Sequence, residues 1–203
     1  MTKFNNKSIK DFLINNALTI VVIAMIIFTA FNATNFVTFK NLTNIVSNVS
    51  MRFIIALGVS GILITKGTDL SAGRVVGITA VIAGGLVQIE GAPNDLFPQI
   101  GPQNVVVVLL VCIIVGMFFG LINGIIVAYF HVPAFIATLG TQIMIYGLNL
   151  LLTQSRPIGT FYKIADGYST FIKIGTQGVN LGSIMIPWLF FFALLIAVLM
   201  SII

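Results

Sequence analysis

The sequence is poor in charged residues. Asp, Glu, Lys and Arg make up 7% of its 203 residues, whereas soluble domains carry about 25%. Hydrophobic residues make up 58%. Five acidic residues cannot provide a solvated surface for a chain of this length, so most of the surface must face something other than water. This composition excludes a water-soluble globule and indicates a protein that lies in a lipid bilayer.

Residues that carry chemistry are also scarce. The single cysteine, Cys112, excludes an intrachain disulfide, and the single histidine, His131, leaves no histidine-based metal site, so we expect no metal. The ten Lys and Arg residues are spread thinly, which argues against nucleic-acid binding. No Gly-x-x-x-x-Gly-Lys-Ser/Thr loop occurs in the sequence, so we expect no cofactor in this chain and no ATP bound through that motif.

Long charge-free gaps predict how the chain crosses the membrane. No charge occurs between Asp11 and Lys40, between Asp95 and Arg156, or after Lys173. A hydrocarbon core of ~30 Å needs about 20 apolar helical residues per crossing, and the runs are continuous rather than alternating. The sequence therefore predicts an all-α integral membrane protein, a single domain of about six transmembrane helices at residues 12–31, 45–65, 75–89, 105–130, 134–152 and 184–203.

The orientation follows from basic residues near the helix ends. Three lysines precede the first helix, which is too long for a cleaved signal peptide, and they favour a cytoplasmic N-terminus. The loop 90–104 has two acids and no Lys or Arg, which fits an external position. The loop 153–183 would also be external, although its three basic residues oppose the positive-inside rule. Within it, residues 161–174 have the pattern of an amphipathic helix that lies on the membrane surface.

A polar insertion separates the second and third predicted helices. Residues 65–74 read Thr-Lys-Gly-Thr-Asp-Leu-Ser-Ala-Gly-Arg. In one interpretation Gly67 ends a helix, Asp69 or Ser71 caps the next, and the basic residues anchor both at the interface. In the other, charged groups at membrane depth line a polar path or a subunit contact, because such groups are costly in lipid. The candidates for that role are Thr68, Asp69, Ser71 and Arg74.

Polar residues inside the apolar runs are further candidates for the substrate pathway. Asn123 could bind a sugar hydroxyl or form an interhelical hydrogen bond. Gln142, Tyr146 and Asn149 follow helical spacing and share one face, which should avoid lipid and either line a path or join helices.

Small residues at every fourth position predict close helix packing. Such a stripe lets another helix approach closely, which favours association in lipid. The stripe consists of Gly116, Gly120, Gly124 and Ala128.

Three motifs resemble those of a known transporter family. They are residues 52–59 leading into Gly-Thr-Asp-Leu-Ser-Ala-Gly-Arg at 67–74, Gly-Leu-Ile-Asn-Gly at 120–124, and Pro-Ala-Phe-Ile-Ala-Thr-Leu-Gly-Thr at 133–141. In order and spacing they are similar to motifs of the permease subunits of ABC importers of the ribose and galactose class, from residue 41 onward. Most members have Gly-Ile-Asp-Leu-Ser-Val-Gly-Ser in the first motif. The version with Thr68, Ala72 and Arg74 is most similar to the galactose and methyl-galactoside permeases.

The resemblance implies a transport subunit rather than an enzyme. It implies a multi-pass protein of the cell membrane that pairs with a second permease copy, cytoplasmic ATP-binding subunits and an extracytoplasmic sugar-binding protein. Galactose or a methyl galactoside is the first expected substrate and ribose-like sugars come next, although the motifs do not fix the sugar. Family members continue past the helix at 184–203, so we expect a truncated chain that lacks the segment that docks the ATPase.

Two other classes of protein remain as alternatives. A secondary transporter would show internal repeats and broken helices, and no convincing repeat is present. An intramembrane enzyme would need a nucleophile with a base in reach or paired carboxylates. Asp69 is the only acid near a helix-rich core, while Glu90, Asp95 and Asp166 lie in loops.

Overall fold

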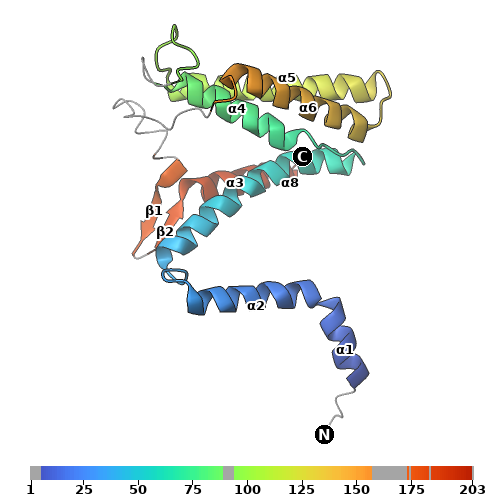
Figure 1. The fold of residues 1–203 in the computed structure, drawn as a ribbon, viewed down its shortest axis with the longest axis vertical. Coiled ribbons are helices and arrows are strands. Elements are labelled where there is room, and N and C mark those ends of the chain that lie inside the picture. The colour runs from blue at the N-terminus through green and yellow to red at the C-terminus, as the bar shows by residue number, and fades with distance from the viewer. Residues whose placement is uncertain (1–5, 89–93, 157–172, 174, 183, 203) are drawn as a thin grey trace.

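The structure is a chain of helices with one small β-hairpin. The computed structural model describes residues 6–88, 94–156, 173, 175–182 and 184–202 (Figure 1). In chain order the described elements are α1 (Asn6–Asn15), α2 (Ala17–Asn32), α3 (Phe39–Ile64), α4 (Ala72–Leu86), α5 (Val105–Ala128), α6 (Ala134–Thr153), β1 (Gly178–Leu181), β2 (Ile184–Pro187) and α8 (Trp188–Ile202).

Helices α4, α5 and α6 pack against one another as one group, here called the three-helix group (Figure 1). Ile78, Phe119 and Ile145, one from each helix, form a buried cluster at its centre. A second cluster, around Leu86 and Val108, holds the end of α4 against the start of α5. These contacts bring the N-terminal ends of α4 and α6 and the C-terminal end of α5 to the same end of the group, at the right in Figure 1.

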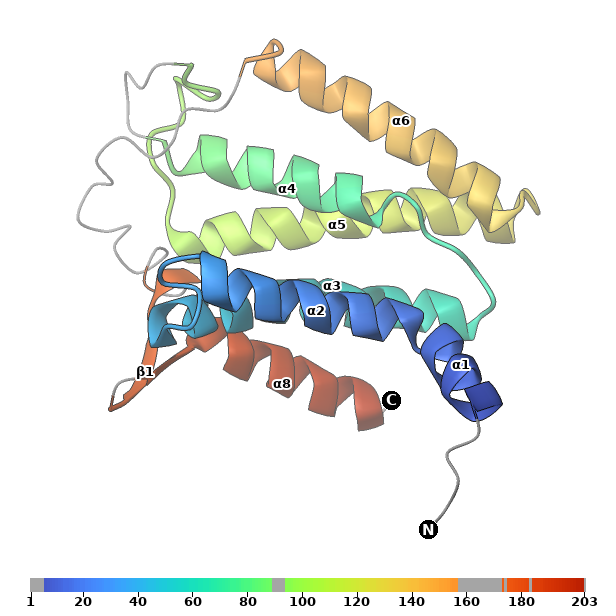
Figure 2. The same cartoon turned by 60° about the horizontal axis from the view of Figure 1, so that its bottom comes forward.

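Helices α3 and α8 and the β-hairpin form a second group. The two strands are antiparallel, with Gly178 opposite Pro187 and Leu181 opposite Ile184. Thr43 of α3 donates a 2.9 Å hydrogen bond to the carbonyl of Met185 in β2, which holds the hairpin against the helix. Helices α1 and α2 extend away from both groups in Figure 1, and Figure 2 shows α2 running alongside α3 in projection.

The outer surface of the helices is apolar. Large hydrophobic side chains such as Leu18 (82% exposed), Met117 (68%) and Leu151 (76%) point outward. Among the described hydrophobic residues, only Ile145 has no exposed area. Such a surface is unfavourable in water and fits lipid. The predicted all-α membrane fold is confirmed, with the short hairpin as an addition.

The helices differ in whether their length alone suffices for a crossing. Among the described residues, α3, α5 and α6 are long and apolar enough, with 26, 24 and 20 residues. The apolar helices α2, α4 and α8 have 16, 15 and 15 residues, or about 22–24 Å at 1.5 Å per residue. A helix of that length needs local thinning of the bilayer or polar residues that reach the interface from its ends.

Two predicted helix ranges differ from the structure. The range 12–31 is broken at Asn16, whose backbone leaves the helical region and whose side chain donates to the carbonyl of Phe12 over 2.9 Å, so two helices form. The range 184–203 begins as strand β2, and α8 starts only after Pro187, because proline lacks the N–H that a helix interior requires.

The other predicted ranges lie close to the observed helices. The second and third helices begin earlier than predicted, at Phe39 and Ala72, and the fourth and fifth begin where predicted, at Val105 and Ala134. The predicted surface helix at 161–174 falls outside the described residues except for Lys173.

Candidate functional site

The loop between α3 and α4 is held in a fixed shape by its own backbone. Lys66 adopts a left-handed conformation (φ 59°), and Gly67 donates through its N–H to the carbonyl of Ile62 over 3.0 Å, which closes the last turn of α3. A β-carbon at Gly67 would lie 2.9 Å from Ile62 Cγ2 and 3.2 Å from the Ile62 carbonyl oxygen, so only glycine fits without a shift. The chain therefore turns sharply and presents the residues that follow to α5 and α6.

A chain of hydrogen bonds links this loop to α5 and α6. Asp69 Oδ1 accepts from the N–H of Ser71 (2.8 Å) and from its hydroxyl (2.7 Å). Asn123 of α5 donates to Ser71 Oγ over 2.9 Å, and Thr141 of α6 donates to Asn123 Oδ1 over 2.6 Å. Ser71 is fully buried and Thr141 is 3% exposed, so these bonds form away from solvent.

Thr138 provides a second attachment between the loop and α6. Its hydroxyl accepts from the N–H of Leu70 over 3.2 Å and lies 3.3 Å from the carbonyl of Thr68 and 2.8 Å from that of Ala134. Thr138 is 4% exposed. The loop is thus attached to α5 and α6 at Thr68, Leu70 and Ser71, and these attachments fix the position of Asp69 between them.

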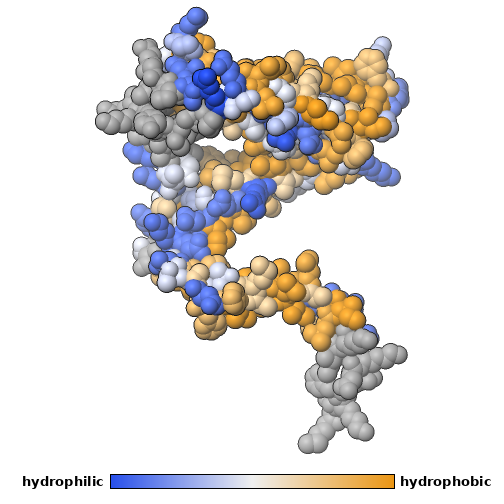
Figure 3. All heavy atoms as spheres, in the orientation of Figure 1, coloured by the Kyte–Doolittle hydropathy of each residue, from blue (hydrophilic) through white to orange (hydrophobic). Residues whose placement is uncertain are grey.

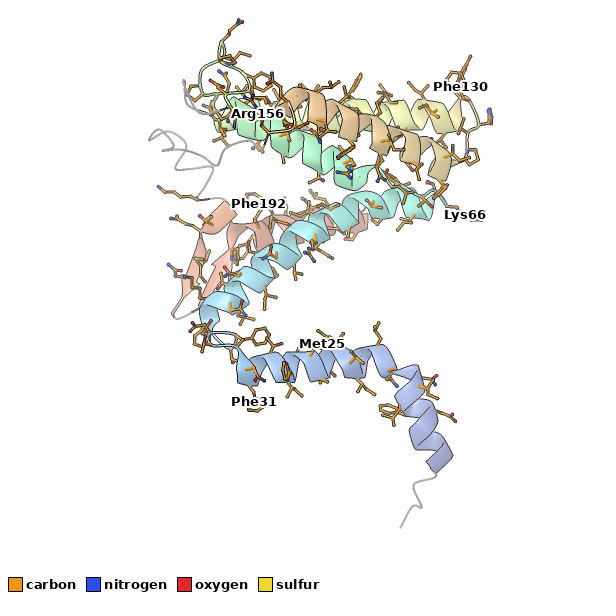
Figure 4. All side chains as sticks on the ribbon, viewed as in Figure 1. Met25, Phe31, Lys66, Phe130, Arg156 and Phe192 are labelled. Carbon is orange, nitrogen blue, oxygen red and sulfur yellow. The ribbon has the colours of Figure 1, made fainter. Side chains whose placement is uncertain are left out.

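A cavity of about 650 Å³ lies beside this network. Its polar lining includes Asp69, Asn123 and Thr138, and the end of α3 and the start of α6 complete its wall. Gly120 and Gly124 of α5 also line it, so their missing side chains leave part of this space open. Figure 4 shows Lys66, which lines the cavity, at the end of the molecule where Phe130 lies, and Arg156 at the opposite end of the three-helix group.

Arg74 lies apart from Asp69. Its guanidinium carbon is 4.6 Å from the ring centre of Tyr146, a cation–π contact between α4 and α6. Within the described residues it forms no ion pair with Asp69, and it does not line the cavity. Asp69 and Arg74 therefore have different surroundings, the first in the polar network and the second on the outer surface of the group.

Two of the three predicted polar residues of α6, Tyr146 and Asn149, face α4. Tyr146 contacts Arg74, while Asn149 faces α4, where its Nδ2 would lie 3.7 Å from a β-carbon at Gly77. Asn149 Oδ1 is buried and has no hydrogen-bond partner in the part of the chain that the structure describes. Gln142 is half-buried, and its side chain makes no hydrogen bond to the described residues.

The glycine stripe of α5 is open in this structure. A β-carbon at Gly116, Gly120 or Gly124 would meet no described atom within 4 Å, and Ala128 is exposed. At Gly77 of α4, by contrast, a β-carbon would be in ordinary contact with the Asn149 side chain of α6. Packing of another helix against the α5 stripe stays a prediction.

Sequence reasoning missed Thr138 and Thr141 as members of the network. Both lie in the motif at 133–141, and their spacing of three places them on one face of α6. That spacing was the available signal. Among the described residues no three His, Cys, Asp or Glu side chains lie close enough to hold a metal ion.

The apolar outer surface, the long helices and the polar cavity at one helix end define a multi-pass integral membrane protein. The chain belongs to a family of transport permeases, since residues 41–203 match the family described as branched-chain amino acid transport system, permease component. No solved structure gives a significant match.

The most similar curated relatives that we compared are sugar permeases. The galactose/methyl galactoside import permease protein MglC of Escherichia coli is 40% identical over 199 residues, 96% of this chain and 57% of its own. MglC of Haemophilus influenzae is 39% identical over 195 residues, 96% of this chain and 56% of its own. The ribose import permease protein RbsC of Haemophilus influenzae is 33% identical over 185 residues, which are 91% of this chain and 53% of its own. The predicted resemblance is confirmed, and the chain spans about half the length of these relatives.

Proposed function

We propose that the chain forms part of the permease subunit of an ATP-driven importer that moves a monosaccharide across the cell membrane. The observation that carries the proposal is the 40% identity to a galactose/methyl galactoside import permease over 96% of the chain. Galactose or a methyl galactoside is therefore the first candidate substrate. A ribose-like sugar is the second, because the ribose import permease is 33% identical.

The chemistry of the cavity supports a neutral sugar as substrate. Its volume of about 650 Å³ falls within the range of small-molecule sites, about 300–1,000 Å³. Each sugar hydroxyl both donates and accepts, and the lining offers a carboxylate acceptor in Asp69, an amide in Asn123 and a hydroxyl in Thr138. Asp69 Oδ2 accepts no hydrogen bond from the described residues and is free to accept one from a sugar.

The candidate residues divide into two roles in this proposal. Thr68, Asp69 and Asn123 line the cavity and contact the sugar, whereas Ser71 is fully buried and positions Asp69. Arg74 and Tyr146 lie on the outer surface of the three-helix group, where they suit a contact with a second copy of the permease. Asn149 lies against α4 in this proposal, and neither it nor Gln142 lines the cavity.

Energy and sugar delivery come from partners in this proposal. The sequence has no phosphate-binding loop of the type described above, so ATP is bound by cytoplasmic ATP-binding subunits, and an extracytoplasmic binding protein delivers the sugar. The three lysines before the first helix favour a cytoplasmic N-terminus. If α1 and α2 together cross once and α3 returns, the loop and its cavity lie at the cytoplasmic end, where the sugar leaves.

The test is uptake of labelled methyl galactoside by cells that express the permease gene with its neighbouring transport subunits. We expect uptake that unlabelled galactose inhibits, that ribose inhibits less, and that leucine, included because of the family description, does not inhibit. Depletion of ATP should abolish uptake even when the proton gradient is maintained. Uptake that survives ATP depletion would favour the secondary-transporter alternative, and inhibition by leucine alone would contradict the sugar assignment.

A further inference from the structure

Helix α3 has one face that packs against protein and two exposed faces of opposite character. The packed face carries Thr43 (8% exposed) and Ser50 (3%), and Thr43 bonds to the hairpin. The exposed faces lie on either side of it. Since a helix turns by about 100° per residue, residues four apart lie only about 40° apart and form a continuous stripe.

The first exposed face is apolar and fits lipid. Its residues are each between 46% and 58% exposed, and two of them form part of an apolar groove with Ile26 of α2. They are Leu42, Ile45, Val49 and Phe53.

The second exposed face is polar at four positions that are spaced four residues apart. Every fourth residue of the N-terminal half of α3 is hydrophilic and exposed, and Figure 3 shows hydrophilic surface over the part of α3 nearest the hairpin. We call this face the α3 polar stripe; it consists of Lys40, Asn44, Asn48 and Arg52.

The polar stripe extends from the helix end to the middle of the bilayer. Helix α3 has 26 residues and is about 39 Å long, and Arg52 lies about 20 Å along it. Lys40 lies at the interface end, whereas Asn48 and Arg52 fall within the predicted span 45–65 at hydrocarbon depth. Amide and guanidinium groups at that depth avoid lipid and face protein or water.

The side chains of the stripe are available for an external partner. The one hydrogen bond among them is from Asn48 Nδ2 to the carbonyl of Asn44, over 2.9 Å, which leaves Asn48 Oδ1 free. Within the described part of the chain, Lys40, Asn44 and Arg52 make no side-chain hydrogen bond or ion pair. Their polar groups are thus not satisfied by the fold that holds them.

We infer that the α3 polar stripe lines a water-filled entry to the sugar pathway, in which Asn48 and Arg52 contact the sugar. The inference rests on the proposed function. Asn44 and Asn48 offer amide donors and acceptors that match the hydroxyls of a neutral polyol, and Arg52 adds donors near the middle of the membrane. Under the expected orientation, α3 begins outside, so this entry lies opposite the cavity around Asp69.

A hydrated path explains this stripe better than a protein contact. Helix contacts in membranes favour small residues that allow close approach, whereas Lys40, Asn48 and Arg52 have long or amide side chains. A protein partner would have to bring a carboxylate to membrane depth to pair with Arg52, and such a group is itself costly in lipid. Water and sugar hydroxyls satisfy both the cations and the amides without further charges.

Cysteine labelling of the permease in its membrane, together with its partner subunits, tests the inference. Cys112 is first replaced by alanine, and single cysteines are then introduced as Asn48→Cys and Arg52→Cys. Val49→Cys and Phe53→Cys are the controls, because each directly follows a test residue in the sequence and lies on the apolar face. Opened vesicles are treated with a charged methanethiosulfonate reagent. We expect the stripe cysteines to react about tenfold faster or more than their controls, because only a hydrated thiol ionises. Added galactose or methyl galactoside should slow the reaction of Asn48→Cys.

Three outcomes are distinct. Equal labelling rates at Asn48→Cys and Val49→Cys would overturn the inference, because the stripe would then be covered by protein. Normal sugar uptake in the same cells would leave the proposed function intact. Rapid labelling that none of galactose, methyl galactoside and ribose slows would overturn the sugar contact. Rapid labelling that a sugar slows supports the inference. If ATP depletion left sugar uptake unchanged in those cells, only the proposed energy source would be wrong.

Discussion

Replacing Asn123 with leucine tests the polar network that connects α4, α5 and α6. Asn123 donates to Ser71 over 2.9 Å and accepts from Thr141 over 2.6 Å, so the substitution removes two hydrogen bonds between elements. Neither hydroxyl loses all its partners, because Ser71 still donates to Asp69 and Thr141 can donate to the carbonyl of Ala137. The cost is therefore the net value of two bonds rather than the desolvation of orphaned groups.

The expected magnitude follows from measurements on membrane helices in general. Interhelical hydrogen bonds there contribute about 0.6 kcal/mol on average and about 1.7 kcal/mol at most. Two such bonds predict that Asn123→Leu lowers the free energy of unfolding by about 1–3 kcal/mol. The assay is unfolding of the purified permease in mixed micelles of increasing denaturing detergent, followed by circular dichroism.

Two comparisons make the result specific to the network. Gln142→Leu removes a half-buried amide that makes no hydrogen bond to the described residues, so its effect should be smaller than that of Asn123→Leu. Adding Thr141→Val to Asn123→Leu should cost less than the sum of the single changes, since the two residues share one bond. If Asn123→Leu cost no more than Gln142→Leu, the hydrogen-bonded network would not be a stabilising feature and the reasoning would be refuted.

Two further predictions concern the cavity. Asp69→Asn keeps an oxygen that accepts both hydrogen bonds from Ser71 but removes the free carboxylate acceptor. We therefore expect normal folding and a sugar uptake that is reduced by about 10- to 100-fold, which corresponds to the loss of one charge-assisted hydrogen bond. Unchanged uptake at matched expression would leave Asp69 only a role in shaping the loop. Gly120→Ala adds a methyl group that meets no described atom within 4 Å, so the free energy of unfolding should stay constant or rise by up to about 1 kcal/mol through helix propensity. A decrease in that free energy would mean that another helix packs on the α5 stripe, as the sequence pattern predicts.

Much of the helical layout could be predicted because lipid imposes a simple rule. Charge-free length marks a crossing, and the predicted starts of α5 and α6 agree with the structure because Asn104 and Pro133 end the preceding loops clearly. The break at Asn16 was not predictable by hydropathy, since one asparagine hardly changes the average of a long apolar run. The strand before α8 was missed for a similar reason, because isoleucines around Pro187 are as apolar in a hairpin as in a helix.

The site was predicted in part. Asp69, Ser71 and Asn123 were singled out because polar groups are costly in lipid, and the structure joins them. Thr138 and Thr141 were passed over because a threonine hydroxyl in a helix commonly bonds to its own backbone, and only the tertiary arrangement shows that these two also reach the loop and α5. The separation of Arg74 from Asp69 depends on which way α4 is rotated, which residue spacing alone does not reveal.

The attachment of one short loop to two helices has a mechanical consequence. Thr138 of α6 holds the loop at Thr68 and Leu70 while Asn123 of α5 holds it at Ser71, so sliding α6 along α5 by a single turn would break the bonds on at least one side of the loop. Rotating α3, α8 and the hairpin against the three-helix group breaks none of them. The motion that keeps all of these bonds is therefore a swing of α3, α8 and the hairpin against the three-helix group, and this swing would widen or narrow the space beside Asp69 while the carboxylate itself stays in place.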